Sequence, residues 1–365
     1  MRRPVAPLLV LAASLGAAAS GPRFRTPDAS LPLSFPRDHG SHDDARVEWW
    51  YVTGHLETGS GRRLGYQLTF FRTGLLDEPR GARSSPLAPR DLHLAHFART
   101  DVDAKTFRYA ERIHRSGLGA AGAREDRLAV VNEEWSLEEL AGRFVLRASD
   151  GDESLSLLLE PEKPPVLHGT NGLSRKGPEP EAVSRYVSFT RLKSSGWLSA
   201  GARSEAVTGS SWMDHEWGPG SIGAEAAGWD WFAIQLADGR DLMLYRIRAK
   251  DGSGSRFSSG TLVAKDGKAR PLSAEEFSIE STATWRSPRS GGVYPARWRI
   301  RVPSGGLDLH VEPLLADQEL VTGKSTRVTY WEGASAVSTP DGRAAGRAYV
   351  ELTGYAGEGA LGLLR

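Results

Sequence analysis

Short runs in which apolar and polar residues alternate dominate this chain, and long runs with a helical period are scarce. Alternation with a period of two is typical of a half-buried β-strand. Residues 296–302 (ARWRIRV) and 307–311 (LDLHV) alternate throughout and are separated by a short turn, so they predict a hairpin. The turn dipeptides Asp238-Gly239 and Asp266-Gly267 predict two more hairpins. The pattern as a whole predicts an all-β fold of antiparallel sheets.

The alternating runs fall into two groups, which predict two consecutive β domains, each a barrel or a sandwich. Residues 161–180 contain five prolines and no periodicity, so they predict a long loop, and such loops often cover a site. We place the predicted domain boundary near residues 201–209, between Gly201 and Gly209. We therefore expect the first domain over residues 21–205 and the second over residues 206–365.

The first twenty residues have the features of a secretory signal peptide. Arg2 and Arg3 supply a positive start, residues 5–15 a short apolar core, and residues 17–20 (AAAS) small side chains for cleavage. The mature protein is expected to be exported, either periplasmic or secreted, and an uncleaved anchor is the alternative. No other run approaches the roughly 20 apolar residues of a membrane-spanning helix, so we expect no integral membrane span in the mature chain.

The composition narrows the possible partners. With 46 basic and 45 acidic residues among 365, the formal net charge is +1, which gives no indication of a nucleic-acid partner. The lack of cysteine excludes disulfides, thiolate metal ligands and a cysteine nucleophile. Motifs for nucleotide binding, α/β-hydrolases and the common zinc proteases are also missing from the sequence. We expect no cofactor, and no pattern sets the oligomeric state.

The candidate working centre is the stretch 210–218, which reads SSWMDHEWG. Asp214, His215 and Glu216 are consecutive there, and ionisable groups crowded between large rings are typical of a lined pocket. Side chains of a strand alternate between two faces. The two predicted faces carry Trp212, Asp214 and Glu216 on one side and Met213, His215 and Trp217 on the other. A turn acid between core tryptophans would produce the same pattern, so the structural interpretation stays open.

Further aromatic residues favour a binding site. Trp229 and Trp231 follow the candidate centre closely, and Trp49, Trp50 and Tyr51 form another cluster. This second cluster either fills a core or lines a ligand cavity, and opposite faces of one strand can do both. Barrels of about eight strands can hold one small ligand, so we expect an apolar small molecule as partner. The rings expected to contact it are Trp212, Trp217, Trp229, Trp231, Trp49, Trp50 and Tyr51.

A histidine-rich segment precedes the first aromatic cluster. His39 and His42 lie among Asp38, Asp43 and Asp44, and such side chains suit zinc or manganese. Their spacing matches no fixed metal motif, and the same residues are common in hydrogen-bonded loops. We therefore assign no metal and keep His39 and His42 only as candidate ligands.

Five longer motifs are spread over most of the mature chain, from about residue 36 to residue 355. They are PRDHGSHDDARVEWWYVTGHL, GYQLTFFR, SSWMDHEWG, WDWFAIQL and YWEGASAVSTPDGRAAGRAYVELTGY. Together they resemble the carotenoid 1,2-hydratase (hydroxyneurosporene synthase) and AttH-like family. The resemblance implies two lipocalin-like β domains in an often exported protein.

The resemblance also implies a chemistry. In the hydratase members a carboxylic acid protonates a terminal isoprenoid double bond, and water captures the resulting tertiary cation. Their motif, similar to Y-H-D-H-N-W-G, places its aspartate on Asp214. This chain departs from that motif at Trp212, Met213 and Glu216, which leaves the substrate open. Independently, a carboxyl can protonate an alkene only if an apolar setting keeps it protonated near neutral pH.

Three functions are compatible with these residues. The first is an exported enzyme that hydrates, isomerises or cyclises an apolar isoprenoid or lipid-like molecule, with Asp214 as acid and then base, and Glu216 and His215 beside it. The second is a carrier that binds a lipophilic ligand without catalysis. The third is metal-assisted hydrolysis through His39 and His42. Fold resemblance alone does not decide among them.

Overall fold

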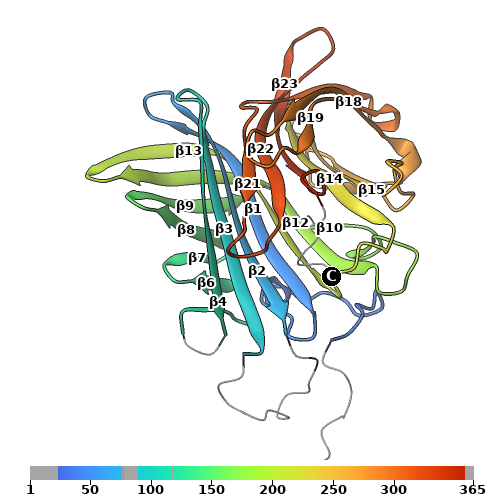
Figure 1. Cartoon of the computed structure of the whole chain (residues 1–365), viewed down its shortest axis with the longest axis horizontal. Coiled ribbons are helices and arrows are strands. Elements are labelled where there is room, and N and C mark those ends of the chain that lie inside the picture. The colour runs from blue at the N-terminus through green and yellow to red at the C-terminus, as the bar shows by residue number, and fades with distance from the viewer. Residues whose placement is uncertain (1–23, 76, 78–88, 117–118, 358–365) are drawn as a thin grey trace, which may run out of the picture.

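The computed structural model describes residues 24–75, 77, 89–116 and 119–357, so the predicted signal peptide lies outside the described residues. Figure 1 shows two antiparallel sheets. The described residues form strands and three short 3-10 helices, η1 (Arg37–His39), η2 (Ala274–Glu276) and η3 (Pro303–Gly305), without any α-helix. None of these helices is long or apolar enough to cross a membrane. The predicted all-β fold with two consecutive antiparallel units is confirmed.

The first sheet has thirteen strands. In spatial order eleven of them are β4 (Thr106–Arg115), β3 (Asp91–Asp101), β2 (Arg63–Gly74), β1 (Val47–Thr58), β13 (Arg203–Gly218), β12 (Val183–Ala200), β9 (Glu153–Pro161), β8 (Arg143–Asp150), β7 (Trp135–Leu140), β6 (Ala129–Asn132) and β5 (Ala121–Ala123). The short strands β10 (Val166–Leu167) and β11 (Leu173–Arg175) pair with β12, and both lie in the segment predicted as a long loop.

The second sheet has ten strands. In spatial order nine of them are β17 (Ala269–Leu272), β16 (Ser259–Val263), β15 (Asp241–Ala249), β14 (Ala226–Leu236), β23 (Ala344–Leu352), β22 (Thr329–Ser338), β20 (Leu307–Pro313), β19 (Val293–Val302) and β18 (Ser278–Arg286), and β21 (Glu319–Val321) pairs with β22. The three hairpins predicted from alternation and turn dipeptides are β14–β15, β16–β17 and β19–β20, and all three are present.

The first sheet extends beyond the domain boundary predicted at residue 205. β13 pairs with both β1 and β12, so the first sheet continues to Gly218 and the second begins at Ala226. Residues 201–209 lie in the β12–β13 hairpin instead of a linker: Gly201 occupies its turn with a φ of 57°. Gly209 lies within β13, where a Cβ would come within 1.9 Å of the His55 carbonyl oxygen on β1. These glycines therefore serve a turn and a close strand approach.

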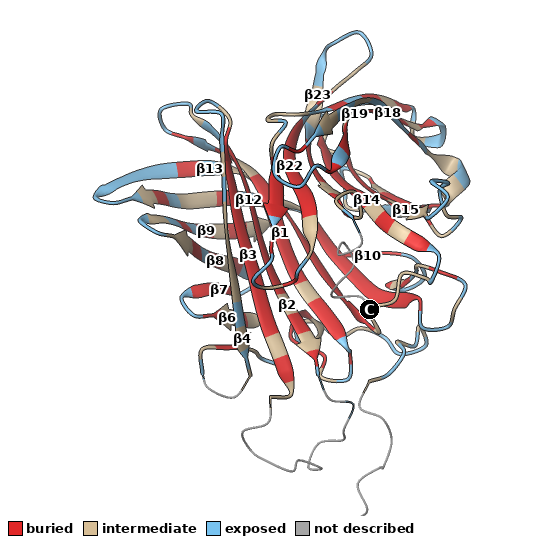
Figure 2. Ribbon diagram, viewed as in Figure 1, coloured by how far each residue is buried: buried red, intermediate tan, exposed pale blue. Residues whose placement is uncertain are grey.

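The central strands of the first sheet are buried on both faces, as Figure 2 shows for β1, β2, β3 and β12. On β1, Trp50 and Val52 point into the core of the first domain, whereas Tyr51 belongs to an apolar cluster shared with the second domain. On β14, Phe232 faces the core of its own domain and Trp231 joins the shared cluster. The two sheets thus pack on each other through one apolar layer, and the candidate site lies in that layer.

Buried ion pairs also hold the domains together. Lys163, between β9 and β10, places its Nζ 2.7 Å from Oδ2 of Asp241 at the start of β15. Arg191 on β12 binds the other oxygen of the same carboxylate at 2.6 Å. Asp241 is fully buried, so losing either cation would leave part of its charge uncompensated, which is strongly destabilising. This contact fixes the second domain against β12, the strand that also contributes to the site.

Candidate functional site

A cavity of about 130 Å³ lies between the two sheets. Its walls come from β1, β2, β3, β12 and β13 of the first domain and from β14, β15, β22 and β23 of the second. One water needs only about 10–15 Å³ by this measure, so the cavity has room for a small organic molecule. Among its aromatic lining residues are Trp49, Tyr51, Tyr186, Trp229, Trp231 and Tyr245.

Asp214 is a buried acid on the first-domain wall of this cavity, with 4% of its surface exposed. Its neighbours are side chains and not backbone amides. Tyr186 donates a hydrogen bond to Oδ2 at 2.6 Å, Trp212 Nε1 donates to Oδ1 at 2.5 Å, and the Ser188 hydroxyl also donates to Oδ1. Both oxygens are therefore fixed in position by the strands around them.

The proton affinity of Asp214 reflects a competition. Burial disfavours the carboxylate, while the donors Ser188, Tyr186 and Trp212 favour it; the negative charge of Glu216 again disfavours it. The effect of burial is larger than that of the donors, and the pKa of Asp214 rises from 3.8 to about 7. The carboxyl can consequently gain or lose a proton near neutral pH, which is the property that general acid–base catalysis requires.

A second layer of polar groups holds the donors in place. Trp231 Nε1 donates a hydrogen bond of 2.9 Å to the Tyr186 hydroxyl, which in turn donates to Asp214. This indole therefore helps to fix the position of the tyrosine hydroxyl. His168 lies 2.7 Å from the Ser188 hydroxyl through Nε2 and 2.8 Å from Thr261 through Nδ1. Burial lowers the pKa of His168 to about 3, so the ring is neutral. The second domain thus helps to orient the acid of the first.

Glu216 shares the Asp214 face of β13 but has a cationic partner. Lys176 Nζ lies 3.1 Å from its carboxylate and 4.0 Å from the centre of the Tyr245 ring. Burial acts to lower the pKa of Lys176, but the charge and hydrogen bond of Glu216, together with Tyr245 and Asp214, outweigh burial, so the pKa of the lysine lies above its ordinary value. Lys176 therefore stays charged, and this part of the wall is a compensated ion pair.

Two further acids, Glu332 on β22 and Glu351 on β23, line the cavity from the second domain. The Tyr51 hydroxyl donates a hydrogen bond of 2.7 Å to Glu332, and Trp229 Nε1 donates one of 3.0 Å to Glu351. Burial raises the pKa of Glu351 to about 8 and that of Glu332 well above its ordinary value. The cavity thus combines an aromatic wall with several acids that hold protons near neutral pH.

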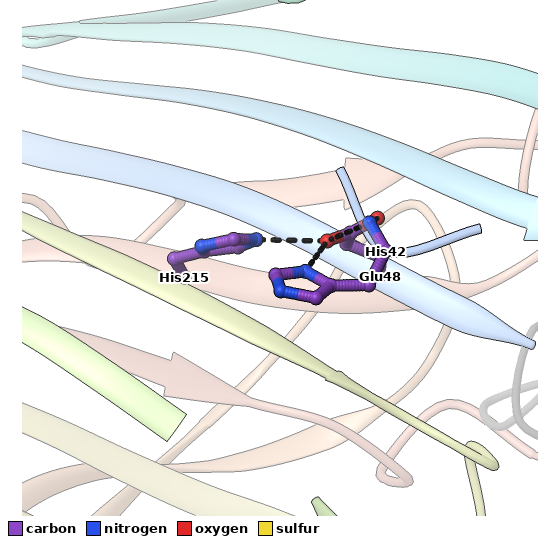
Figure 3. Close-up of side chains that lie close together, drawn as sticks. All are labelled: His42, Glu48 and His215. Atoms are coloured by element: carbon purple, nitrogen blue, oxygen red, sulfur yellow. Dashed lines mark hydrogen bonds and ion pairs between the residues drawn. The ribbon is translucent and has the colours of Figure 1, made fainter. Parts of the chain in front are cut away.

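The opposite face of β13 carries a separate polar cluster, shown in Figure 3. His42 Nδ1 and His215 Nε2 lie 2.8 and 2.9 Å from the same oxygen of Glu48, and their ligand atoms fall within 4.8 Å of one another. This donor set suits a metal such as zinc. However, Arg72 Nε binds the other oxygen of Glu48 at 3.0 Å, so the carboxylate already has a buried counter-ion. We interpret this trio as an ion-pair network that anchors residues 36–45.

The structure divides the predicted site residues between the two faces of their strands. The cavity wall contains Asp214, Glu216, Trp49, Tyr51, Trp229 and Trp231. Trp212 does not line this cavity but bonds Asp214, and its ring meets that of Trp231 edge to face at 6.2 Å.

The remaining predicted residues lie away from the cavity. His215, Trp50 and Trp217 are on the opposite faces, where His215 stacks against Trp50 at 4.9 Å and Trp217 against His42 at 3.9 Å. His39, in η1, is not part of the His42–Glu48–His215 cluster and stacks on Phe35 at 4.2 Å. The three strand residues His215, Trp50 and Trp217 each neighbour, in sequence, a residue that faces the cavity, and neighbours in a strand point to opposite faces.

Sequence reasoning missed several residues of the site. Tyr186, Glu332 and Glu351 lie in β12, β22 and β23, but nothing in the sequence of those segments indicates which face meets the other domain. Lys176 lies in the predicted loop 161–180, so the expectation that this loop covers a site was the one available signal.

Fold and site together define a class of protein: two lipocalin-like β domains with an acid-bearing cavity between them. Residues 26–355 match the model of the AttH-like family, and the chain belongs to this family. The family resemblance seen in the sequence is thereby confirmed. No curated protein sequence matches the chain.

Solved structures share the fold. The structure is similar to that of an AttH-type protein from Nitrosomonas europaea, with a TM-score of 0.83 and 37% identity, covering 92% of this chain and 100% of the other. It is also similar to kievitone hydratase from Nectria haematococca, with a TM-score of 0.65, 15% identity and coverage of 91% and 97%. CghA in complex with Sch210972 matches with a TM-score of 0.51, 14% identity and coverage of 93% and 98%. At such identities the last two show a common fold only.

Proposed function

We propose that this protein binds an apolar isoprenoid or lipid-like molecule in the cavity between its domains and adds water to a carbon–carbon double bond, as a hydro-lyase. The observation that carries the proposal is Asp214: a carboxyl on the wall of an aromatic cavity, with burial raising its pKa to about 7. Kievitone hydratase, which shares the fold, is by its name a hydratase, and this is consistent with the proposed chemistry.

The proposed reaction has two steps. The protonated carboxyl of Asp214 gives its proton to one alkene carbon, and the electrons of the double bond form the new C–H bond and leave a cation on the other carbon. Water then forms a C–O bond to that cation and returns a proton to the Asp214 carboxylate. The faces of Trp229 and Trp231 stabilise the positive charge, as aromatic rings do for other cations.

A non-catalytic carrier is the second candidate, and one observation favours it. Both oxygens of Asp214 already accept hydrogen bonds from Tyr186, Trp212 and Ser188. An acid held in this way can also serve only to fix the strands around a ligand cavity.

We further propose that the protein is exported, because residues 1–20 resemble a signal peptide. N-terminal sequencing of the protein from the native host tests this proposal by locating the cleavage site.

Mass spectrometry of lipophilic molecules extracted from the native protein would identify the ligand. The purified protein is then incubated with that molecule in water labelled with deuterium and oxygen-18. Hydration incorporates both labels, and Asp214→Asn should abolish incorporation while keeping the ligand bound. Asp238→Asn, which changes a half-exposed acid paired with Arg240, is the matched control and should convert normally. Equal behaviour of Asp214→Asn and the parent protein, with or without conversion, would contradict a role of Asp214 as the acid.

A further inference from the structure

The two acids on the second-domain wall form a pair. Glu332 and Glu351 are directly opposite each other across the antiparallel strands β22 and β23. Opposite residues of such strands place their side chains on the same face with Cβ atoms about 4.5–5.5 Å apart. Both side chains line the cavity, so the pair faces the space in which a ligand would lie.

This pair lacks a counter-ion within the described part of the chain. Glu332 is 1% exposed, accepts a hydrogen bond from Tyr51 through Oε2, and lines the cavity. Glu351 accepts a hydrogen bond from Trp229 through Oε1. Neither carboxyl forms a salt bridge with a described lysine, arginine or histidine. Two acids side by side in an apolar setting without a cation are unfavourable when charged.

The first-domain wall of the same cavity shows how this protein accommodates a positive charge. There Glu216 binds Lys176 at 3.1 Å, and the lysine nitrogen lies 4.0 Å from the ring centre of Tyr245 and 4.9 Å from that of Tyr186. A carboxylate and aromatic faces together are a favourable environment for a cation. The Glu332–Glu351 pair on the second-domain wall also has aromatic rings beside it, but the described chain places no cation between the two acids.

We propose that the Glu332–Glu351 pair binds a positively charged head group of the ligand, so that the substrate is an apolar molecule that carries a protonated amine or a quaternary ammonium. This inference rests on the proposed function in that it takes the cavity as the ligand site. It adds an orientation: the charged head lies at β22 and β23, and the apolar body extends toward Asp214 on the opposite wall.

A cationic head group has a measurable consequence for protons. A positive charge close to a carboxyl lowers its pKa by about 1–3 units. The pKa of Glu351 without ligand is about 8, so a bound cation brings it to neutral pH or below and a proton leaves. Other ionisable groups that interact electrostatically with the pair are Tyr51, Tyr330, Tyr349, Asp214 and Glu216. A neutral ligand of the same shape has no such effect.

The test compares two probes of equal length, the octylammonium ion and 1-octanol, with the full-length protein near neutral pH. Isothermal titration calorimetry in buffers of different ionisation enthalpy gives both the affinity and the number of protons released. We expect octylammonium to bind at least about tenfold more tightly than 1-octanol. Its binding should also release up to about one proton per ligand, whereas 1-octanol releases none.

Variants assign the effect to the pair. Glu351→Gln alone, and the Glu332→Gln/Glu351→Gln double variant, should lose the preference for octylammonium and the proton release but still bind 1-octanol, which also shows that they fold. Glu312→Gln, an exposed acid of the same domain paired with Arg297, is the matched control and should behave as the parent. Asp214→Asn should keep the preference, because the head group binds the opposite wall.

Equal affinities for the two probes, or an ammonium preference that survives the double variant, would overturn the proposal. Either result leaves label incorporation through Asp214 untouched, so the proposed hydration would stand. Conversely, a failure of Asp214→Asn to change label incorporation removes the proposed chemistry without affecting octylammonium binding. The two inferences therefore fail separately.

Discussion

Replacing Tyr186 by phenylalanine should raise the pKa of Asp214. The Tyr186 hydroxyl donates a hydrogen bond of 2.6 Å to Asp214 Oδ2, and this bond stabilises the carboxylate more than the neutral acid. Phenylalanine keeps the ring and its packing in the layer between the domains, so the change is confined to one hydroxyl. Without that donor, fewer hydrogen bonds stabilise the Asp214 carboxylate against burial, so the acid keeps its proton to a higher pH.

The size of the effect follows from the strength of such a bond. A hydrogen bond to a charged group contributes about 1.5–3 kcal/mol, and one pKa unit corresponds to about 1.4 kcal/mol. Losing the Tyr186 hydroxyl should therefore raise the pKa of Asp214 by about 1–2 units, from about 7 to about 8–9. The bonds from Trp212 and Ser188 remain, so the carboxyl still ionises at high pH.

Infrared difference spectroscopy measures this directly, because a protonated carboxyl has a C=O band that the carboxylate lacks. Titrating that band with pH in the parent and in Tyr186→Phe gives the two pKa values, and the Asp214→Asn spectrum identifies the band. Tyr245→Phe is the control: its hydroxyl lies 3.0 Å from that of Ser174, and it contributes no hydrogen bond to Asp214. An unchanged or lowered pKa in Tyr186→Phe would show that burial is not opposed by this hydroxyl, and the account of the site would be wrong.

Two further predictions concern stability. Asp214 has a pKa of about 7 when folded against 3.8 ordinarily, so the folded state binds the proton more tightly and stability falls as pH rises from about 4 to about 7. Asp214→Asn should remove about 4 kcal/mol of that fall in urea unfolding, and parallel stability curves for the two proteins would contradict this. Arg72→Met should lower the free energy of unfolding by about 3–5 kcal/mol, since it leaves Glu48 without its buried counter-ion. Unchanged chemical denaturation would instead assign that role to His42.

Much of the fold could be predicted because strand geometry leaves its period in the sequence. The period of two correctly placed Asp214 and Glu216 on one face of β13 and His215 on the other. Turn dipeptides located the second-domain hairpins for an equally local reason, since Asp-Gly favours the tight turn between two strands.

The identity of the cavity face could not be predicted in this way. β1 and β13 are buried on both sides, so hydrophobicity does not distinguish the face toward the first core from the face toward the second domain. Trp50 and Trp217 are as apolar as Trp49, yet they pack away from the cavity. The same limit applies to Glu351. It lies more than a hundred residues after Asp214 in the sequence, and only the fold brings the two side chains to the same cavity.

The chemistry proposed for Asp214 depends on the second domain. Tyr186, Trp212 and Ser188, the donors that favour its charge, all come from the first sheet, whereas Trp231, Glu332 and Glu351 close the cavity from the second. With the first sheet alone, the Asp214 face of β13 would meet water, which would weaken the burial that raises the pKa of the acid. The donors would then favour the carboxylate against a smaller effect of burial. The raised pKa of Asp214 is therefore a property of the packed pair of domains, because the first sheet supplies the acid and its donors and the second sheet supplies much of its burial.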